Sequence, residues 1–255
     1  MADPFGITAL YGSMQWCSLT FLPRSIRIPG FTMTAPKYEK GVVVGNTYDK
    51  YGTRNPLARL LVGGFLSSFD QLVERADPET ILEVGCGEGH LAFRASGPDR
   101  RVLGTDLSGQ MIEVARQKCS PTGPGLLFRE SDLFDLDPAD GRYDLVVCCE
   151  VLEHLQSPEE AILHLKRLSR GMILLSVPRE PIWRILNLAR GRYVRDLGNT
   201  PGHLQHWSRR SFLHLVRRHL TIIEVRSPFP WTMVLAGTPP PSGSDQLRTR
   251  PSSTE

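Results

Sequence analysis

The stretch ILEVGCGEGH, residues 81–90, decides the fold, because a short apolar run leads directly into three alternate glycines. Glycine tolerates positive φ, and at Gly85, Gly87 and Gly89 it lets backbone amides approach a ligand closely. Asp106 ends the next apolar run of the chain, and a carboxylate there is placed to accept both hydroxyls of an adenosine ribose. Together these features predict a strand, a ligand-binding turn and a helix.

Strand-length apolar runs alternate with helix-length amphipathic segments around this stretch. Ser108 and Ser157 stand where helix N-caps belong, and Pro158 fits a first helical turn. Because parallel strands need long crossover connections, the alternation predicts a doubly wound α/β sheet. The runs 221–229 and 231–237 are joined too tightly for a helix, which predicts an antiparallel hairpin at the sheet edge. The other predicted strands are 81–84, 101–106, 125–130, 143–149 and 172–177, and the predicted helices are 108–119 and 157–168.

The composition is that of an ordinary globular protein, with 255 residues of which 40% are apolar and 22% charged. That length suits one mid-sized domain with a full core. The sequence has no run of about 18 apolar residues, and we expect neither a membrane-spanning helix nor a secretory leader. The five cysteines are scattered without a CxxC pair, which speaks against a disulfide scaffold or structural zinc and favours a reducing cytoplasm.

The two ends of the chain differ from its middle. Residues 1–36 are interrupted by prolines and show no clear periodicity, so we expect a disordered N-terminal appendage. Residues 238–255 are rich in proline, serine and threonine, which predicts a disordered tail. The folded domain is expected between them, at 37–237.

Charge is distributed unevenly, although the net charge is only +3. Residues 79–160 carry sixteen acidic and seven basic side chains, whereas residues 181–220 carry eight arginines and a single acid, Asp196. An acid-rich half suits a ligand with a positive centre better than one with a pyrophosphate. The arginine-rich half is open to three interpretations: a solvated surface, a site for an anionic substrate, or a membrane-facing surface.

The glycine spacing is GxGxG, which differs from the GxGxxG of dehydrogenases. With the preceding glutamate, it resembles motif I of the class I S-adenosylmethionine-dependent methyltransferases. The resemblance covers about residues 75–237 and is closest to the small-molecule branch, which includes the ubiquinone-pathway O-methyltransferases. It implies a Rossmann-like, doubly wound seven-stranded sheet, mostly parallel with an antiparallel C-terminal hairpin. The matching residues are Glu83, Gly85, Gly87, Gly89, Asp106, Ser131, Asp132, Glu150, Glu153, His154 and Leu155.

The same resemblance implies S-adenosylmethionine as the cofactor and assigns its contacts. The glycine loop and its glutamate hold the methionine moiety, and the acid after the second strand holds the ribose. The residues after the third strand flank the adenine. Leu107 and Met111, which follow the second strand, are candidates to pack against it, although ordinary core packing is the favoured role for Met111. The expected cofactor-binding residues are Glu83, Gly85, Cys86, Gly87, Gly89, Asp106, Leu107, Met111, Asp132, Leu133 and Glu150.

The fourth predicted strand runs into Cys148, Cys149, Glu150 and Val151. Class I enzymes that methylate exocyclic base nitrogens carry Asn/Asp-Pro-Pro-Tyr/Phe at this place. Because that polar cradle for an amino group is absent, the sequence favours an oxygen acceptor, with sulfur, nitrogen and carbon left open.

Glu150, Glu153 and His154 are spaced at i, i+3 and i+4, which places them on one face if a helical turn begins there. The motif resembles one in ubiquinone-pathway and small-RNA 2′-O-methyltransferases, in which such residues and a later histidine can hold a divalent ion. Here that histidine is His203 or His206. The alternatives are His154 acting alone as a general base, and simple packing of the turn. We expect His154 and Glu153 to be catalytic, assign no metal ligand and leave a divalent metal open.

A lid or acceptor segment is expected at about 181–207, because this fold usually inserts its acceptor-specific lid after the fifth strand. Trp183 and aliphatic residues alternate there with arginines. This pattern fits a lid over an apolar, anionic acceptor, an interfacial amphipathic helix or an ordinary surface helix.

We expect a small-molecule or lipid-like acceptor, and we leave peripheral membrane contact open. Nucleic acid is disfavoured because no RNA-binding module is visible. The competing functions are an RNA ribose methyltransferase, a catalytically silent S-adenosylmethionine-binding partner protein and, remotely, a nicotinamide oxidoreductase.

Overall fold

The structure is a computed structural model that describes residues 37–39, 42–44, 55–119 and 125–237. The appendage expected at 1–36 and the tail expected at 238–255 lie outside these residues. β1 (Lys37–Glu39) and β2 (Val42–Val44) form an antiparallel pair of their own. Among the helices described, none combines the length and apolarity needed to cross a membrane.

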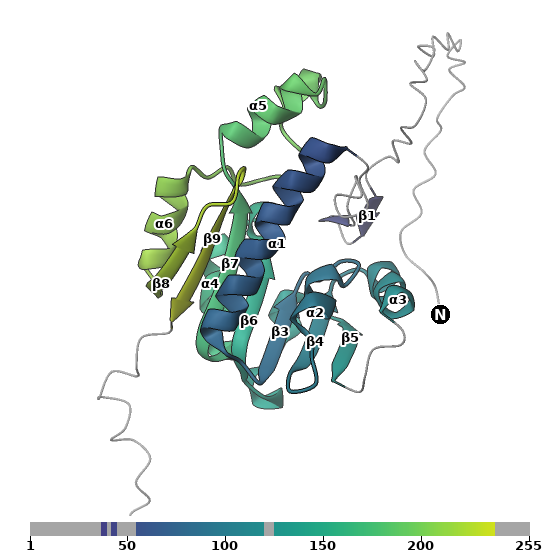
Figure 1. Cartoon of the computed structure of the whole chain (residues 1–255), viewed down its shortest axis with the longest axis vertical. Helices are drawn as coiled ribbons and strands as arrows, with labels where there is room; N and C mark the ends of the chain where they lie inside the picture. The colour runs from purple at the N-terminus through teal and green to yellow at the C-terminus, as the bar shows by residue number, and fades with distance from the viewer. Residues whose placement is uncertain (1–36, 40–41, 45–54, 120–124, 238–255) are drawn as a thin grey trace, which may run out of the picture. The chain divides into compact units, whose positions relative to one another are not determined.

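The main sheet has seven strands in the order β5-β4-β3-β6-β7-β9-β8 (Figure 1). The first five in this order pair in parallel, whereas β9 is antiparallel to both of its neighbours. The predicted mostly parallel sheet with an antiparallel C-terminal hairpin is therefore confirmed. The strands are β3 (Thr80–Val84), β4 (Arg101–Asp106), β5 (Leu126–Glu130), β6 (Tyr143–Cys149), β7 (Ser169–Pro178), β8 (Thr221–Arg226) and β9 (Trp231–Gly237).

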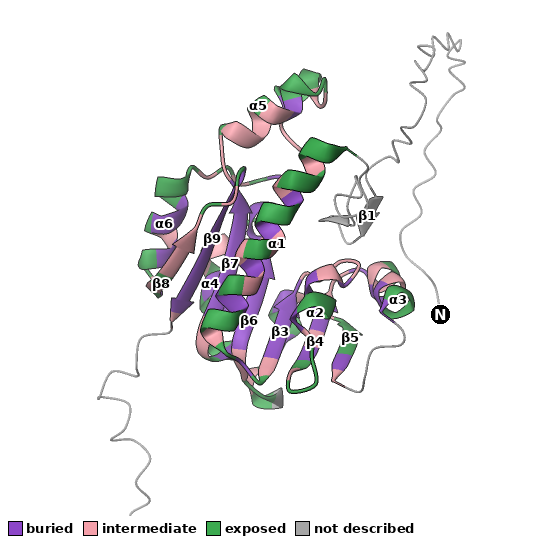
Figure 2. Ribbon diagram, in the orientation of Figure 1, coloured by how far each residue is buried: buried purple, intermediate pink, exposed green. Residues whose placement is uncertain are grey.

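Helices cover both faces of this sheet, and its inner strands are therefore mostly buried (Figure 2). α1 and α2 bury one apolar core against it, and α4 and α6 bury the other. Because both faces are covered, inner strands such as β6 are continuous apolar runs. The helices are α1 (Pro56–Ala76), α2 (His90–Ala95), α3 (Gly109–Lys118), α4 (Pro158–Leu168), α5 (Ile182–Ala189) and α6 (Arg209–Arg217), with 3₁₀ turns η1 (Leu133–Asp135), η2 (Pro138–Asp140), η3 (Leu152–His154) and η4 (Val194–Asp196).

Of the two predicted serine caps, Ser108 makes a capping hydrogen bond and Ser157 does not. Ser108 caps α3, and its hydroxyl accepts a hydrogen bond from the amide of Met111 at 3.3 Å. Ser157 occupies the cap position of α4, but its side chain makes no capping hydrogen bond. Pro158 at the first position and two glutamates in the first turn favour the start of α4 instead.

α1 is a long helix that the sequence analysis does not predict. Asn55 caps it, accepting hydrogen bonds from the amides of Leu57 and Ala58 at 2.9 and 3.2 Å, and Pro56 follows at the first helical position. The Asn-Pro start and the spacing of apolar residues are the features that would have predicted this helix. Its buried side chains are Val62, Phe65, Phe69, Leu72 and Val73.

Candidate active site

The carboxyl ends of β3, β4 and β6 meet where the order of the sheet reverses direction. From β3 the chain continues to β4 and β5 on one side, and β6 then pairs with the other side of β3. Ligands of open α/β sheets bind in the crevice at this kind of switch point. The glycine loop, Asp106 and the 150–154 segment directly follow these three strands, so the topology brings the predicted site residues to one edge.

The loop after β3 is fastened to β4 through its backbone. The amides of Gly85 and Cys86 both donate to the carbonyl of Thr105, at 2.8 and 2.9 Å. Gly85 has a φ of +73°, and a Cβ atom there would lie 2.3 Å from Cγ2 of Val151. Glycine is therefore required at this position by both the backbone conformation and the close approach of the chain after β6.

Gly87 and Asp106 form a cradle at the carboxyl ends of β3 and β4. The amide of Gly87 donates to Oδ2 of Asp106 at 2.8 Å, and the amide of Ser108 donates to Oδ1 at 2.9 Å. A Cβ atom on Gly87, whose φ is +53°, would meet nothing within 4 Å. Each carboxylate oxygen accepts more than one hydrogen bond, so a ligand hydroxyl can join these amides. The cradle therefore combines open space with a fixed carboxylate.

The residues expected around an adenine occupy different environments. Asp132 caps η1, with Oδ1 accepting from the amide of Phe134 at 2.9 Å. The side chain of Leu133 is buried in the core on the α4 face, so only its backbone is left to contact a ligand. Leu107 is half-buried. Met111 is half-buried and lies outside both buried clusters.

Glu150 does not share a face with the residues that follow it. The 3₁₀ turn η3 begins two residues later, and Glu150 itself has a left-handed φ of +62°. Its carboxylate accepts from Ser176 Oγ at 3.1 Å and from Trp231 Nε1 at 2.6 Å. The prediction of one face for Glu150, Glu153 and His154 is therefore wrong.

The structure brings His203, and not His206, to the η3 turn. Side-chain ligand atoms of Glu153, His154 and His203 lie within 4.8 Å of one another. Glu153 and His203 are buried, and the imidazoles of His154 and His203 pack edge to face with ring centroids 4.9 Å apart. Nε2 of His206 lies instead at 2.8 Å from Oδ1 of Asn199. We call Glu153, His154 and His203 the η3 cluster.

The tautomer of His154 follows from its partner. Nδ1 of His154 lies 3.0 Å from the carbonyl oxygen of Gly202. A carbonyl only accepts, so Nδ1 carries the hydrogen and, in the neutral ring, Nε2 carries the lone pair. That nitrogen is therefore the one that can accept a proton or hold a metal ion.

An aromatic cluster joins this edge to α1 and α5. Trp231, which begins β9, packs on Phe65 of α1 and Trp183 of α5 at centroid distances of 5.1 and 5.6 Å. Ser176 and Trp231 are site residues that were not predicted from the sequence. The end of a parallel strand and the start of an antiparallel neighbour fall at the same sheet edge, and this rule could have found both.

The cysteines at this edge are chemically quiet. Burial, with the charges of Glu83 and Asp106 as further causes, raises the pKa of the Cys86 thiol. Burial also raises the pKa of the Cys148 and Cys149 thiols. These groups remain protonated at neutral pH, and a thiol nucleophile at this edge is therefore disfavoured.

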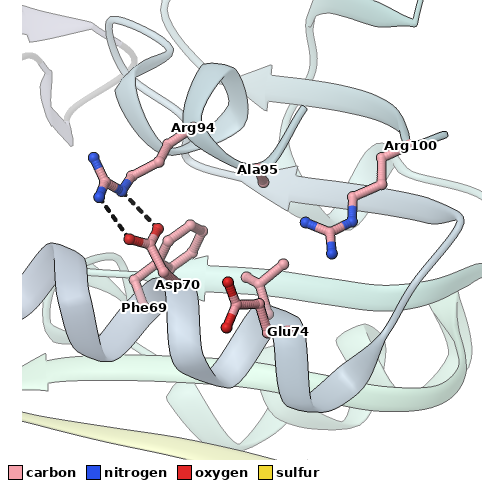
Figure 3. Close-up of a pocket in the computed structure, with 7 residues that line it drawn as sticks. Phe69, Asp70, Glu74, Arg94, Ala95 and Arg100 are labelled. Atoms are coloured by element: carbon pink, nitrogen blue, oxygen red, sulfur yellow. Dashed lines mark hydrogen bonds and ion pairs between the residues drawn. The ribbon is translucent and has the colours of Figure 1, made fainter. Parts of the chain in front are cut away.

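A separate hollow of about 310 Å³ lies between α1, the end of α2 and Arg100 (Figure 3). Arg94 and Asp70 form a two-pronged ion pair there, with Nε of Arg94 2.6 Å from Oδ1 of Asp70. Arg100 directly precedes β4, so the hollow lies at the opposite end of that strand from Asp106 and is not part of the candidate site. Its lining residues are Phe69, Asp70, Val73, Glu74, Arg94, Ala95 and Arg100.

Part of the chain, including the residues at this edge of the sheet, is similar to known proteins. Residues 81–170 match the family model described as Methyltransferase domain. The chain is 28% identical over 158 residues to the ubiquinone biosynthesis O-methyltransferase of Nitrosomonas europaea, covering 56% of this chain and 67% of that protein. Residues 81–170 therefore belong to a methyltransferase domain. The resemblance predicted from the sequence is confirmed.

Other relatives of the methyltransferase domain differ in the atom they methylate. The ajmaline N-methyltransferase of Rauvolfia serpentina is 28% identical over 188 residues, covering 64% of this chain and 65% of that protein. YqeM of Bacillus subtilis, named as a methyltransferase, is 30% identical over 138 residues, or 46% of this chain and 56% of that protein. The chain thus spans between about half and two thirds of the lengths of these relatives.

Solved structures support the fold of the domain. Magnesium protoporphyrin IX methyltransferase from Synechocystis, solved with bound S-adenosylhomocysteine, superposes with a TM-score of 0.57 at 22% identity, covering 74% of this chain and 90% of that one. The N-methyltransferase NodS of Bradyrhizobium japonicum superposes with a TM-score of 0.54 at 16% identity, covering 70% of this chain and 97% of that one. At these identities the likeness shows the fold alone.

Proposed function

We propose that this protein transfers a methyl group from S-adenosylmethionine, bound at the glycine loop, to an acceptor held near the η3 cluster. The observation that carries the proposal is the cradle of Gly87 and Asp106, with open space beside a fixed carboxylate. S-adenosylmethionine supplies an activated methyl group on a positive sulfur. The chain's own residues bind the two partners, orient them and take up the acceptor's proton. Transfer of a labelled methyl group into an extract tests this proposal directly.

The electrostatics of the loop suit a cationic cofactor. Glu83 is buried at the end of β3, and the charges of Glu83 and Asp106 help to raise the pKa of the Cys86 thiol. Burial is the first cause of that shift, but the two carboxylates themselves give the loop a negative local field, which suits a sulfonium better than a pyrophosphate. We assign the ribose hydroxyls to Asp106, the methionine moiety to the glycine loop, and the adenine to Asp132 and the backbone of Leu133.

We propose an oxygen atom as the acceptor because the η3 cluster provides a base. Nε2 of His154 can take the proton that a hydroxyl loses as it attacks the methyl group. Glu153 is buried beside it and stabilises the imidazolium that results. We therefore assign His154 as the general base and Glu153 as its electrostatic partner.

The donor set of the η3 cluster also fits a divalent metal ion. Two imidazoles and one carboxylate within 4.8 Å suit Mn²⁺, Fe²⁺ or Zn²⁺ better than Mg²⁺, which prefers oxygen ligands. Glu153, His154 and His203 would hold the ion, and Nε2 of His154 would then be a ligand and not the base. The ion would instead lower the pKa of the acceptor hydroxyl.

If the metal assignment is right and His154 is a ligand, chelation lowers methyl transfer by at least about tenfold, and Mn²⁺ restores it. The measurement is label transfer into an extract after treatment with EDTA, with and without added Mn²⁺. S-adenosylhomocysteine affinity, measured by calorimetry in the same samples, should stay unchanged. Full transfer in excess EDTA would contradict the metal and leave His154 as a metal-free base.

We propose that the acceptor is lipid-like and that the edge formed by α5, η4 and the start of α1 contacts an anionic membrane surface. Contacts of Phe65 and Trp183 with Trp231 bring α1 and α5 together at this edge. Exposed apolar side chains flanked by exposed arginines are typical of interfacial segments, and the cytoplasmic leaflet carries the matching negative charge. The apolar side chains are Leu57, Leu60, Ile185, Leu188, Val194 and Leu197, and the exposed arginines are Arg190 and Arg195.

Reversing charge at this edge is expected to weaken vesicle binding by at least about tenfold, since each basic residue near an anionic surface contributes about 1 kcal/mol. The variant is Arg190→Glu with Arg195→Glu, and the measurement is co-sedimentation with vesicles of phosphatidylglycerol and phosphatidylcholine. Arg217→Glu, on the exposed side of α6, is the matched control. Equal binding of all three proteins, or equal binding to pure phosphatidylcholine, would contradict the membrane contact.

A further inference from the structure

The segment that delivers His203 to the η3 cluster is a tight turn. The amide of His203 donates to the carbonyl of Thr200 at 3.1 Å, and Gly202 has a φ of +86°. Proline and glycine at the two central positions, with positive φ at the glycine, define a type II turn. The turn thus fixes the course of the backbone that carries His203.

This turn also sets the partner of His154 and is fastened to η3. The carbonyl of Gly202, inside the turn, is the one that faces Nδ1 of His154. The next two amides, of Leu204 and Gln205, both donate to the carbonyl of Glu153, at 2.8 and 3.0 Å. The turn therefore holds all three members of the η3 cluster. It contains His203, its Gly202 carbonyl faces Nδ1 of His154, and the two amides that follow it donate to the carbonyl of Glu153.

α5 holds the same turn from the other side through one hydroxyl group. Oγ1 of Thr200 accepts hydrogen bonds from Nε1 of Trp183 at 2.9 Å and from Nδ2 of Asn187 at 3.1 Å. These two donors lie one helical turn apart on α5, and Asn187 is buried. The indole of Trp183 also stacks on His203, with centroids 6.4 Å apart and planes 20° apart.

We infer that Thr200 is a positioning residue that couples α5 to the η3 cluster. Its hydroxyl locks the turn to α5, and the turn presents both the Gly202 carbonyl and the His203 ring to η3. The position of α5 and the arrangement of the two histidines are therefore coupled. A ligand that fixes the position of α5 also fixes the arrangement of the cluster. The inference rests on the proposed function only in giving the cluster its catalytic role.

Thr200→Val tests this coupling, and Thr200→Ser is the matched control. Valine keeps the shape but removes the acceptor of Trp183 Nε1 and one of the two acceptors of Asn187 Nδ2, which also donates to the carbonyl of Gly198 at 2.9 Å. Serine keeps the oxygen. The first readout is the tautomer of His154 from long-range ¹H–¹⁵N NMR. We expect one tautomer, protonated at Nδ1, in the wild type and the serine variant, and a mixture in the valine variant. The second readout is Mn²⁺ affinity by electron paramagnetic resonance, which should fall about tenfold in the valine variant alone.

The outcomes separate this inference from the proposed function. A valine variant with the wild-type His154 spectrum and Mn²⁺ affinity would overturn the positioning role of Thr200. A wild type that binds no Mn²⁺ would contradict the metal, and the tautomer would then decide the inference alone. If the valine variant does not fold, Trp183→Phe removes one donor while keeping an aromatic ring, and a native His154 spectrum in that variant would equally overturn the coupling.

Discussion

Replacing Asp106 by alanine is expected to weaken the binding of S-adenosylhomocysteine by at least about 100-fold. Hydrogen bonds to a charged group contribute about 1.5–3 kcal/mol each, and two ribose hydroxyls would lose their acceptor together. The change also removes the partner of the Gly87 amide, which shapes the glycine loop. The affinity is measured by calorimetry, with circular dichroism to show that the fold persists.

Asp99→Ala is the matched control for this experiment. Asp99 is an exposed carboxylate in the connection before β4, at the opposite end of that strand from Asp106. Its loss should leave the affinity unchanged. An Asp106→Ala protein with wild-type affinity would refute the ribose assignment and, with it, the position of the cofactor.

Replacing Glu153 by glutamine is expected to lower methyl transfer by about 100-fold or more while leaving S-adenosylhomocysteine affinity unchanged. The substitution keeps the shape of a buried side chain and removes the charge that faces His154 and His203. Loss of a general base or its electrostatic support typically costs this much rate. The measurement is label transfer at saturating cofactor.

The control for the Glu153 variant is Glu160→Gln, which removes an exposed carboxylate from the first turn of α4. This protein should transfer methyl groups at the wild-type rate. Wild-type transfer by the Glu153→Gln protein would show that alignment of donor and acceptor is sufficient, without a charged η3 cluster.

The sheet and the glycine loop were predictable because their determinants are local. Apolar runs of strand length, the alternate glycines at 85–89 and the carboxylate of Asp106 all lie within the segments they organise. The cap of α3 at Ser108 follows the same rule. The long helix α1 has an equally local start at Asn55 and Pro56, so the sequence contains the information that predicts it.

The details of the catalytic edge depend on contacts between distant segments. The choice between His203 and His206 rests on a turn that docks about 50 residues away from η3 in the chain, which spacing does not encode. Glu150 turns away from Glu153 because Ser176 and Trp231, on two other strands, bind its carboxylate. Helical spacing alone placed these residues on one face, and tertiary hydrogen bonds overrode that preference.

Transfer of labelled methyl groups into fractionated host extract tests directly whether the protein methylates a lipid-like oxygen acceptor with S-adenosylmethionine. We expect label in the organic phase, in an ether or ester linkage, and no transfer by the Asp106→Ala protein. Label in aqueous metabolites or in RNA would contradict the lipid-like acceptor while keeping the reaction. Absence of label from every fraction, with S-adenosylhomocysteine bound normally, would contradict the enzyme itself and favour a silent cofactor-binding protein.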